Sequence, residues 1–189
     1  MPEFNSVHMK ILWGNISLIV CCAFYLAWWL LAFKPEGGVR GIRTGWLLIP
    51  AFIAGIFAVI SVSGGMNSAV TDRMLYGKGT VMITGIVTYV ILVIVTYKLM
   101  NRPVTTELFL IIGWAVLVFL EINTLYGMGD LSILQSVIFC VITVIATVIS
   151  MIAYCRYYGL DPAAGYIDGM IPLIMCAVVM AAISIAMCL

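Results

Sequence analysis

Charge is what this sequence lacks most. Only 9% of its 189 residues are Asp, Glu, Lys or Arg, whereas soluble domains carry about 25%. Hydrophobic residues make up 65% of the chain, and the mean hydropathy is +1.21. This composition excludes a soluble globular protein and favours an integral membrane protein. The formal net charge of +1 offers no electrostatic basis for binding nucleic acid.

Histidine and the motifs of enzymes are almost absent too. The single histidine, His8, lies in the stretch MPEFNSVH (residues 1–8), which resembles a vector-derived leader and is left out of the fold prediction. Without it the chain contains no histidine, which argues against histidine-ligated metals, histidine-ligated haem and Ser-His catalysis. There is no GxSxG, HExxH, P-loop or dinucleotide fingerprint, and the six cysteines form no CxxC pair. We therefore expect no cofactor, no metal site and no enzymatic activity.

Long apolar runs, in contrast, fill the chain. A bilayer-spanning helix needs about 20 predominantly apolar residues. Six segments approach or exceed that length, and they predict an all-α, polytopic membrane protein with six transmembrane helices in a single domain, residues 9–189. The predicted spans are approximately 9–33, 46–62, 80–99, 105–126, 132–154 and 170–188.

The loop charges predict the orientation. Connections after the first, third and fifth spans carry six cations, and the opposite side carries three. By the positive-inside rule the first set is cytoplasmic, so both termini face outward from the plasma membrane. The two sets are Lys34, Arg40, Arg43, Lys98, Arg102 and Arg156, and Lys10, Arg73 and Lys78.

A faint threefold pattern accompanies these charges. Each odd-numbered span ends in an aromatic-cation stretch followed by a proline, namely Pro35, Pro103 and Pro162. The pattern is compatible with three related two-helix hairpins, although any cytoplasmic turn needs cations and a helix breaker. This plan resembles the small urea and amide channel family in architecture, but none of that family's sequence patterns is present.

The fourth span carries the strongest functional signal. Glu121 lies among apolar residues, where an ionised carboxylate would cost several kcal/mol, so it must be protonated, paired or facing a wet cavity. Trp114 shares its helix face, whereas Asn123 points about 200° away. Three interpretations are open: a structural acid inside the bundle, a proton- or cation-handling site, and an acid that reaches the membrane interface.

Polar faces also mark the odd-numbered spans. On the fifth, small and hydroxyl residues recur at spacings of 4, 3, 4, 3 and 4. Such a face either packs against neighbouring helices or lines a narrow hydrated path. The first and third spans have similar faces, whereas the even-numbered spans present small residues suited to close packing. The three faces are Ser136, Cys140, Thr143, Thr147, Ser150 and Tyr154; Gly14, Ser17, Cys21, Tyr25 and Trp28; and Thr80, Thr84 and Thr88.

Polar residues and prolines near span ends have ordinary explanations. Asn15 is close to the outer end of the first span and is predicted to be interfacial. Asp168 immediately precedes the last span, which favours an N-capping role. Pro50 and Pro172 sit near the starts of their helices, where proline is tolerated.

These features lead to one functional hypothesis and two alternatives. The chain is predicted to move a small solute or ion across the lipid bilayer, as a monomer or a homo-oligomer. Glu121 would be the titratable or cation-contacting group. The alternatives are a non-catalytic membrane subunit that docks partner helices, and a membrane-embedded enzyme acting on lipid near Asp161, Asp168 and Arg156. The predicted path comprises Glu121, Trp114, Asn123, Thr143, Thr147, Ser150 and Tyr25.

Overall fold

The computed structural model describes residues 5–34, 42–100, 106–159 and 165–188. In these residues six helices are long and apolar enough to cross a membrane, which confirms the predicted all-α, six-span fold. They are α1 (Ser6–Ala32), α3 (Leu48–Ser68), α4 (Lys78–Met100), α5 (Thr106–Met128), α6 (Ile133–Gly159) and α7 (Ile171–Cys188). Two short elements, α2 (Ile42–Gly45) and η1 (Asp168–Met170), precede α3 and α7.

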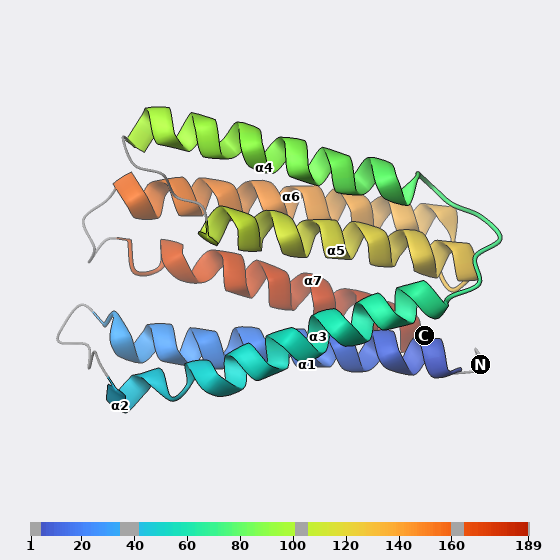
Figure 1. The fold of residues 1–189 in the computed structure, drawn as a ribbon, viewed down its shortest axis with the longest axis horizontal. Helices are drawn as coiled ribbons and strands as arrows, with labels where there is room; N and C mark the ends of the chain where they lie inside the picture. The colour runs from blue at the N-terminus through green and yellow to red at the C-terminus, as the bar shows by residue number, and fades with distance from the viewer. Residues whose placement is uncertain (1–4, 35–41, 101–105, 160–164, 189) are drawn as a thin grey trace.

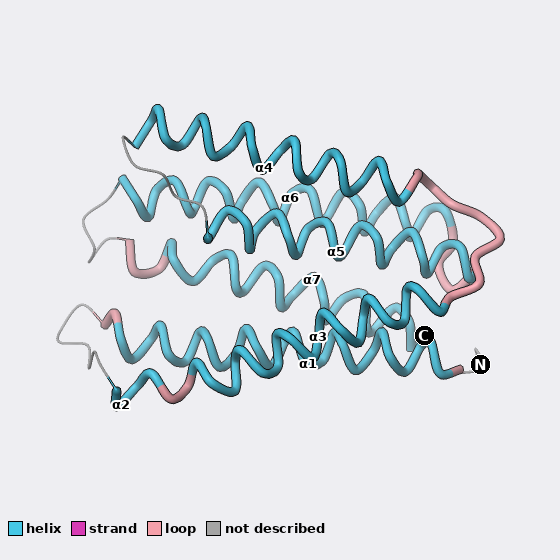
Figure 2. Tube along the Cα trace, viewed as in Figure 1, coloured by secondary structure: helices cyan, strands magenta, loops and turns pink. Residues whose placement is uncertain are grey.

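The six long helices lie side by side, and the connections gather at the two ends of the bundle (Figures 1 and 2). Both chain termini lie at one end, which we call the terminal end; the opposite end is the far end. Consecutive spans pack on each other, α1 on α3, α4 on α5, α5 on α6 and α6 on α7, and α1 also packs on α7. Whether the terminal end faces outward remains a prediction. The proposed hairpin prolines Pro35, Pro103 and Pro162, and the cations Arg40 and Arg102, lie outside the described residues.

Side chains at the helix starts explain several boundaries. Asn5 caps α1 in a capping box with His8, so α1 begins at Ser6 rather than near Met9. His8 Nε2 also lies 2.9 Å from Asp130 Oδ1 and ties this start to the α5–α6 connection. Ser132 and Gln135 bond reciprocally at the start of α6. Helix α1 thus includes residues 6–8 of the stretch that was predicted to be a vector-derived leader. The vector origin of that stretch stays a prediction.

The start of α7 corrects one prediction. Asp168 does not cap this helix, which begins three residues later at Ile171. Its carboxylate Oδ2 lies instead 3.5 Å from Arg156 Nε on α6, the helix against which η1 packs. The two prolines behave as expected: Pro50 and Pro172 occupy the first turns of α3 and α7, where the missing N–H breaks no helical hydrogen bond.

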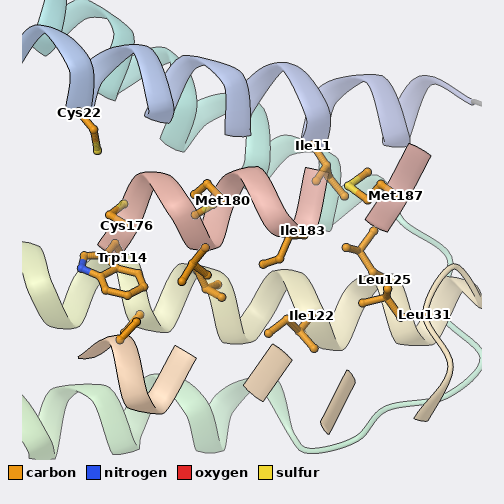
Figure 3. Close-up of a cluster of buried hydrophobic side chains, with 14 of the residues drawn as sticks. Ile11, Cys22, Trp114, Ile122, Leu125, Leu131, Cys176, Met180, Ile183 and Met187 are labelled. Atoms are coloured by element: carbon orange, nitrogen blue, oxygen red, sulfur yellow. The ribbon is translucent and has the colours of Figure 1, made fainter. Parts of the chain in front are cut away.

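Helix α5 is the centre of the bundle. In its most apolar stretch 61% of the residues are buried, compared with 6% for α4. Its Val118 and Ile122 are fully buried in a core cluster that also contains Met180 and Ile183 of α7; Figure 3 shows Ile122 on α5 and Met180 and Ile183 on the neighbouring α7. Lipid is as apolar as these side chains, so this contact is stabilised by close packing rather than by water exclusion.

Small residues set the contact between α1 and α3. A Cβ on Gly14 would lie 2.9 Å from the Val62 backbone nitrogen and 3.1 Å from the Ala58 carbonyl oxygen. A Cβ on Gly55 would lie 3.2 Å from Cys21 Sγ. The two backbones therefore approach as closely as glycine allows. At Gly14 and Cys21, the predicted polar face of the first span is a packing contact with α3.

The first, third and fifth spans, which are α1, α4 and α6, do not surround a common axis. Helices α1 and α4 lie on opposite sides of the bundle, with α5, α6 and α7 between them (Figure 1). On α4, Thr80 and Thr84 are exposed on the surface and do not face α6. The arrangement therefore points to the central helix α5, rather than to a lumen shared by three odd-numbered spans.

Candidate functional site: a buried glutamate and asparagine

Glu121 lies in the interior of the bundle. Its side chain has 0% exposed area, and its Oε1 accepts a hydrogen bond of 2.6 Å from Nδ2 of Asn15, which is also 0% exposed. The pair joins α5 to α1, two helices that are far apart in the sequence. This geometry rules out the interpretation of Glu121 as an acid that reaches the membrane interface and contacts water there.

The depth of the pair follows from helix geometry. Glu121 lies seven residues before Met128 at the end of α5, and Asn15 lies nine residues after Ser6 at the start of α1. At 1.5 Å per residue these positions are about 10 and 13 Å from their helix ends. Both side chains therefore lie within their helices and away from the ends, and Asn15 is fully buried; that Asn15 is interfacial stays a prediction.

The pair leaves polar atoms without partners. Glu121 Oε2, Asn15 Oδ1 and Trp114 Nε1 are buried and have no hydrogen-bond partner among the described residues. Leaving a buried polar group unsatisfied costs about 1–3 kcal/mol, and more for a charged group. The ion pairs formed by the described side chains involve His8 with Asp130 and Arg156 with Asp168, not Glu121. No cation therefore neutralises this carboxyl group within the described part of the chain.

Trp114 lies two helical turns before Glu121. Seven residues turn a helix to within about 20° of the same direction, so the two side chains share one face of α5, as predicted. Trp114 is buried in the same core cluster as Val118 and Cys176, and Figure 3 shows its ring beside Cys176 of α7. The indole N–H is thus a second unsatisfied polar group on the Glu121 face.

Asn123 serves a different contact. Its Oδ1 accepts a hydrogen bond of 2.8 Å from the Leu75 N–H, and its Nδ2 donates one of 2.9 Å to the Tyr76 carbonyl. The Tyr76 hydroxyl donates to the Phe119 carbonyl at 2.8 Å, and burial raises the pKa of this phenol above its ordinary value, with the Cys140 hydrogen bond adding to the shift. Asn123 therefore holds the α3–α4 connection against α5 and does not meet Glu121.

Replacing Asn123 by leucine is expected to release this connection, because both backbone hydrogen bonds are lost together. The amide of Leu75 should exchange with deuterium at least tenfold faster, since a free-energy change of about 1.4 kcal/mol corresponds to a factor of ten. Hydrogen–deuterium exchange mass spectrometry on peptides covering residues 69–77 measures this. Peptides from α1 serve as the internal control, and unchanged exchange at Leu75 would contradict the assigned role.

The hydroxyl stripe on α6 uses its donors internally. Ser136, Thr143 and Ser150 are fully buried, and each hydroxyl donates to the carbonyl four residues earlier, at 2.9, 2.7 and 2.7 Å. The half-buried Thr147 does the same at 2.7 Å. Hydroxyls bonded in this way let helices pack without an unsatisfied group. The geometry therefore favours the packing interpretation of this stripe.

Tyr25 lies apart from the other predicted residues. It is half-buried, and its ring meets the Trp28 ring edge-on with centroids 5.3 Å apart. Ten residues separate it from Asn15, about 15 Å along α1 toward the far end. The structure thus places Glu121 and Trp114 on one face of α5 and leaves Asn123 and Tyr25 in separate places.

The residue that sequence reasoning missed is Asn15. The sequence shows an asparagine inside an apolar run, but it does not show the partner of that side chain. The available signal was depth: Asn15 and Glu121 lie at similar distances from the ends of the first and fourth spans that face the same side of the membrane. Two polar residues at one depth are candidates for hydrogen bonding across a helix bundle.

The site holds too few ligands for a metal ion. Among the described residues no group of three or more His, Cys, Asp or Glu side chains could bind one, and Glu121 supplies a single carboxylate. In comparisons with protein-family models, curated proteins and solved structures, nothing matches this chain.

Proposed function

We propose that this protein moves a proton or another small solute across the membrane, and that Glu121 is the group that binds it. The observation that carries the proposal is the fully buried carboxyl, held through one oxygen by Asn15 and without a partner for the other. Ionisable groups inside membrane spans are expensive, and they commonly mark ion pathways and proton relays.

The position of the pair between helix groups supports a transport role. Helix α1 packs chiefly on α3 and α7, whereas α5 packs chiefly on α4 and α6, and α7 joins the two groups because it also packs on α6. The hydrogen bond between Asn15 and Glu121 crosses the boundary between these two groups. A small relative motion of the groups would open this boundary and expose the carboxyl group to one side of the membrane, as alternating access requires.

Replacing Glu121 by glutamine tests the proposal. The amide has the size of the acid and keeps an oxygen for the Asn15 donor, so the fold should persist while the titratable group is lost. In reconstituted vesicles, proton flux followed with a trapped pH-sensitive dye should fall at least tenfold. Fluxes of urea, glycerol, ammonium and potassium are measured in parallel, and one of these should change if the cargo is not the proton.

Glu107→Gln is the matched control. Glu107 lies on the same helix, two heptads before Glu121, but it is exposed and accepts a hydrogen bond of 2.7 Å from the Tyr158 hydroxyl. Its replacement should leave every flux within about twofold of the wild type, because surface substitutions rarely change a buried site. If Glu121→Gln leaves all of these fluxes unchanged, Glu121 has no part in transport.

A second candidate function is supported by α4. This helix is the least buried span, with only 6% of its most apolar stretch covered, and Thr80 and Thr84 face outward from it. A non-catalytic subunit that docks partner helices would present such a face. Stoichiometric co-purification of partner proteins in mild detergent, combined with fluxes no higher than those of empty vesicles, would favour this function over transport.

A further inference from the structure

We infer that Glu121 and Asn15 together form a binding site for a single proton, carried on Glu121 Oε2 and donated to Asn15 Oδ1. The inference rests on the proposed transport function only where it names the proton as the transported species. Whether Glu121 carries a proton can be measured independently of transport. The inference deepens the proposal by naming the cargo, a proton rather than a metal cation or a neutral solute.

Counting donors and acceptors leads to this assignment. The Asn15 amide has an NH2 group with two N–H donors and one acceptor oxygen, and one N–H of its Nδ2 donates to Glu121 Oε1 at 2.6 Å. The two remaining atoms, Glu121 Oε2 and Asn15 Oδ1, are both buried and both unpartnered. With an ionised carboxylate both are acceptors, and neither can satisfy the other. A proton on Oε2 supplies the missing donor, so an amide and a carboxylic acid can form a reciprocal two-bond pair.

The surroundings do not offer an ionised carboxylate a counter-charge. Among the described cations, Lys10 contacts Ser68 on α3 and Arg156 pairs with Asp168. Besides Glu121, the titratable groups that the described residues place in the core shared by α1, α5 and α7 are the thiols of Cys22 and Cys176. An isolated carboxylate in such an interior is expected to be neutralised by protonation.

A proton also fits the number of ligands better than a metal ion does. Calcium takes 6–8 oxygen ligands and magnesium about six. The site offers two unpartnered oxygens, and the described residues contain no cluster of three or more metal-ligating side chains. A proton needs only one oxygen to carry it and one acceptor to receive its hydrogen bond.

Release of the proton is a balanced step. The O–H bond on Glu121 Oε2 breaks, its electron pair stays on the carboxylate, and the proton passes to a water molecule that enters from one side, giving hydronium. The carboxylate then keeps the hydrogen bond from Asn15 Nδ2, and Asn15 Oδ1 loses its donor. Uptake from the other side reverses these changes, so one cycle carries one positive charge unless another charge moves with it.

Infrared spectroscopy of the protein in lipid vesicles tests the inference directly. The chain has eight Asp and Glu residues, and exposed carboxyls are ionised at about pH 7. The wild type should nevertheless show the C=O stretching band of a protonated carboxylic acid at this pH. The band should persist in Glu107→Gln, disappear in Glu121→Gln, and move to higher frequency in Asn15→Leu, because the hydrogen bonds to the acid are lost.

The outcomes separate this inference from the proposed function. Absence of the band in the wild type at about pH 7 would overturn the inference, and this measurement does not depend on whether any variant folds. A band that survives in Glu121→Gln would overturn it too, because the proton would then reside on another acid. A band that behaves as expected, together with unchanged proton flux in Glu121→Gln, would retain the proton site and reject transport through it.

Discussion

Replacing Asn15 by leucine is expected to lower the free energy of unfolding by about 1–3 kcal/mol, because it leaves the buried Glu121 carboxyl without its hydrogen-bond partner. Leucine has the branched shape of asparagine and is larger, so the substitution leaves no cavity. Glu121→Gln should be close to neutral, because the glutamine amide can donate to Asn15 Oδ1 as the protonated acid does. The free energies are obtained by titrating detergent-solubilised protein with a denaturing detergent and following circular dichroism.

A double substitution isolates the contact. Adding Glu121→Met to Asn15→Leu removes both polar partners and should recover most of the lost stability, since replacing both members of a buried pair by apolar groups is nearly neutral. Residues in direct contact typically couple by about 0.5–3 kcal/mol. The single variants Asn15→Leu and Glu121→Met are measured as well. If the double variant loses as much free energy of unfolding as these two lose in sum, the hydrogen bond between Asn15 and Glu121 contributes nothing to the fold.

Gly14→Ala is expected to lower the free energy of unfolding by about 1–3 kcal/mol through overpacking. The new Cβ would lie 2.9 Å from the Val62 backbone nitrogen and 3.1 Å from the Ala58 carbonyl oxygen. Neither backbone atom can move unless α3 shifts away from α1. The steric cost should exceed the gain of about 1 kcal/mol that alanine usually brings to a helix. The same denaturation titration measures it.

Gly64→Ala is the matched control for this glycine. Gly64 lies in α3, and a Cβ built there meets nothing within 4 Å. The free energy of unfolding should stay unchanged or rise slightly, because only the helix propensity improves. Equal losses in both variants would show that glycine matters here for backbone flexibility and not for close approach of the two helices.

Some properties of this protein could be predicted from local sequence because they depend on composition and segment length. Apolar runs about as long as a bilayer is thick specify six helices, since the backbone polar groups must be satisfied within each span. The burial of Glu121 and its separation from Asn123 followed from the apolar neighbours and from the 100° turn per residue. Both predictions used information contained in one segment of the chain.

Pairing between segments could not be predicted in this way. The hydroxyl stripe on α6 suggested either packing or a path, and only the geometry showed that Thr143 and Ser150 donate to their own helix. On α4 a similar stripe begins with Thr80 and Thr84, and both of these residues are exposed. Helical periodicity identifies a face; it does not tell what covers that face.

The sequence by itself determined that this chain is a six-helix membrane protein with one acid in an unfavourable place. Tertiary structure alone decided that Asn15, 106 residues away along the chain, is the partner of that acid, and that Gly14 is one of the residues at which α1 meets α3. The physical reason is that hydrophobicity acts on each segment separately, whereas hydrogen bonds and close packing depend on which side chains are brought together in space.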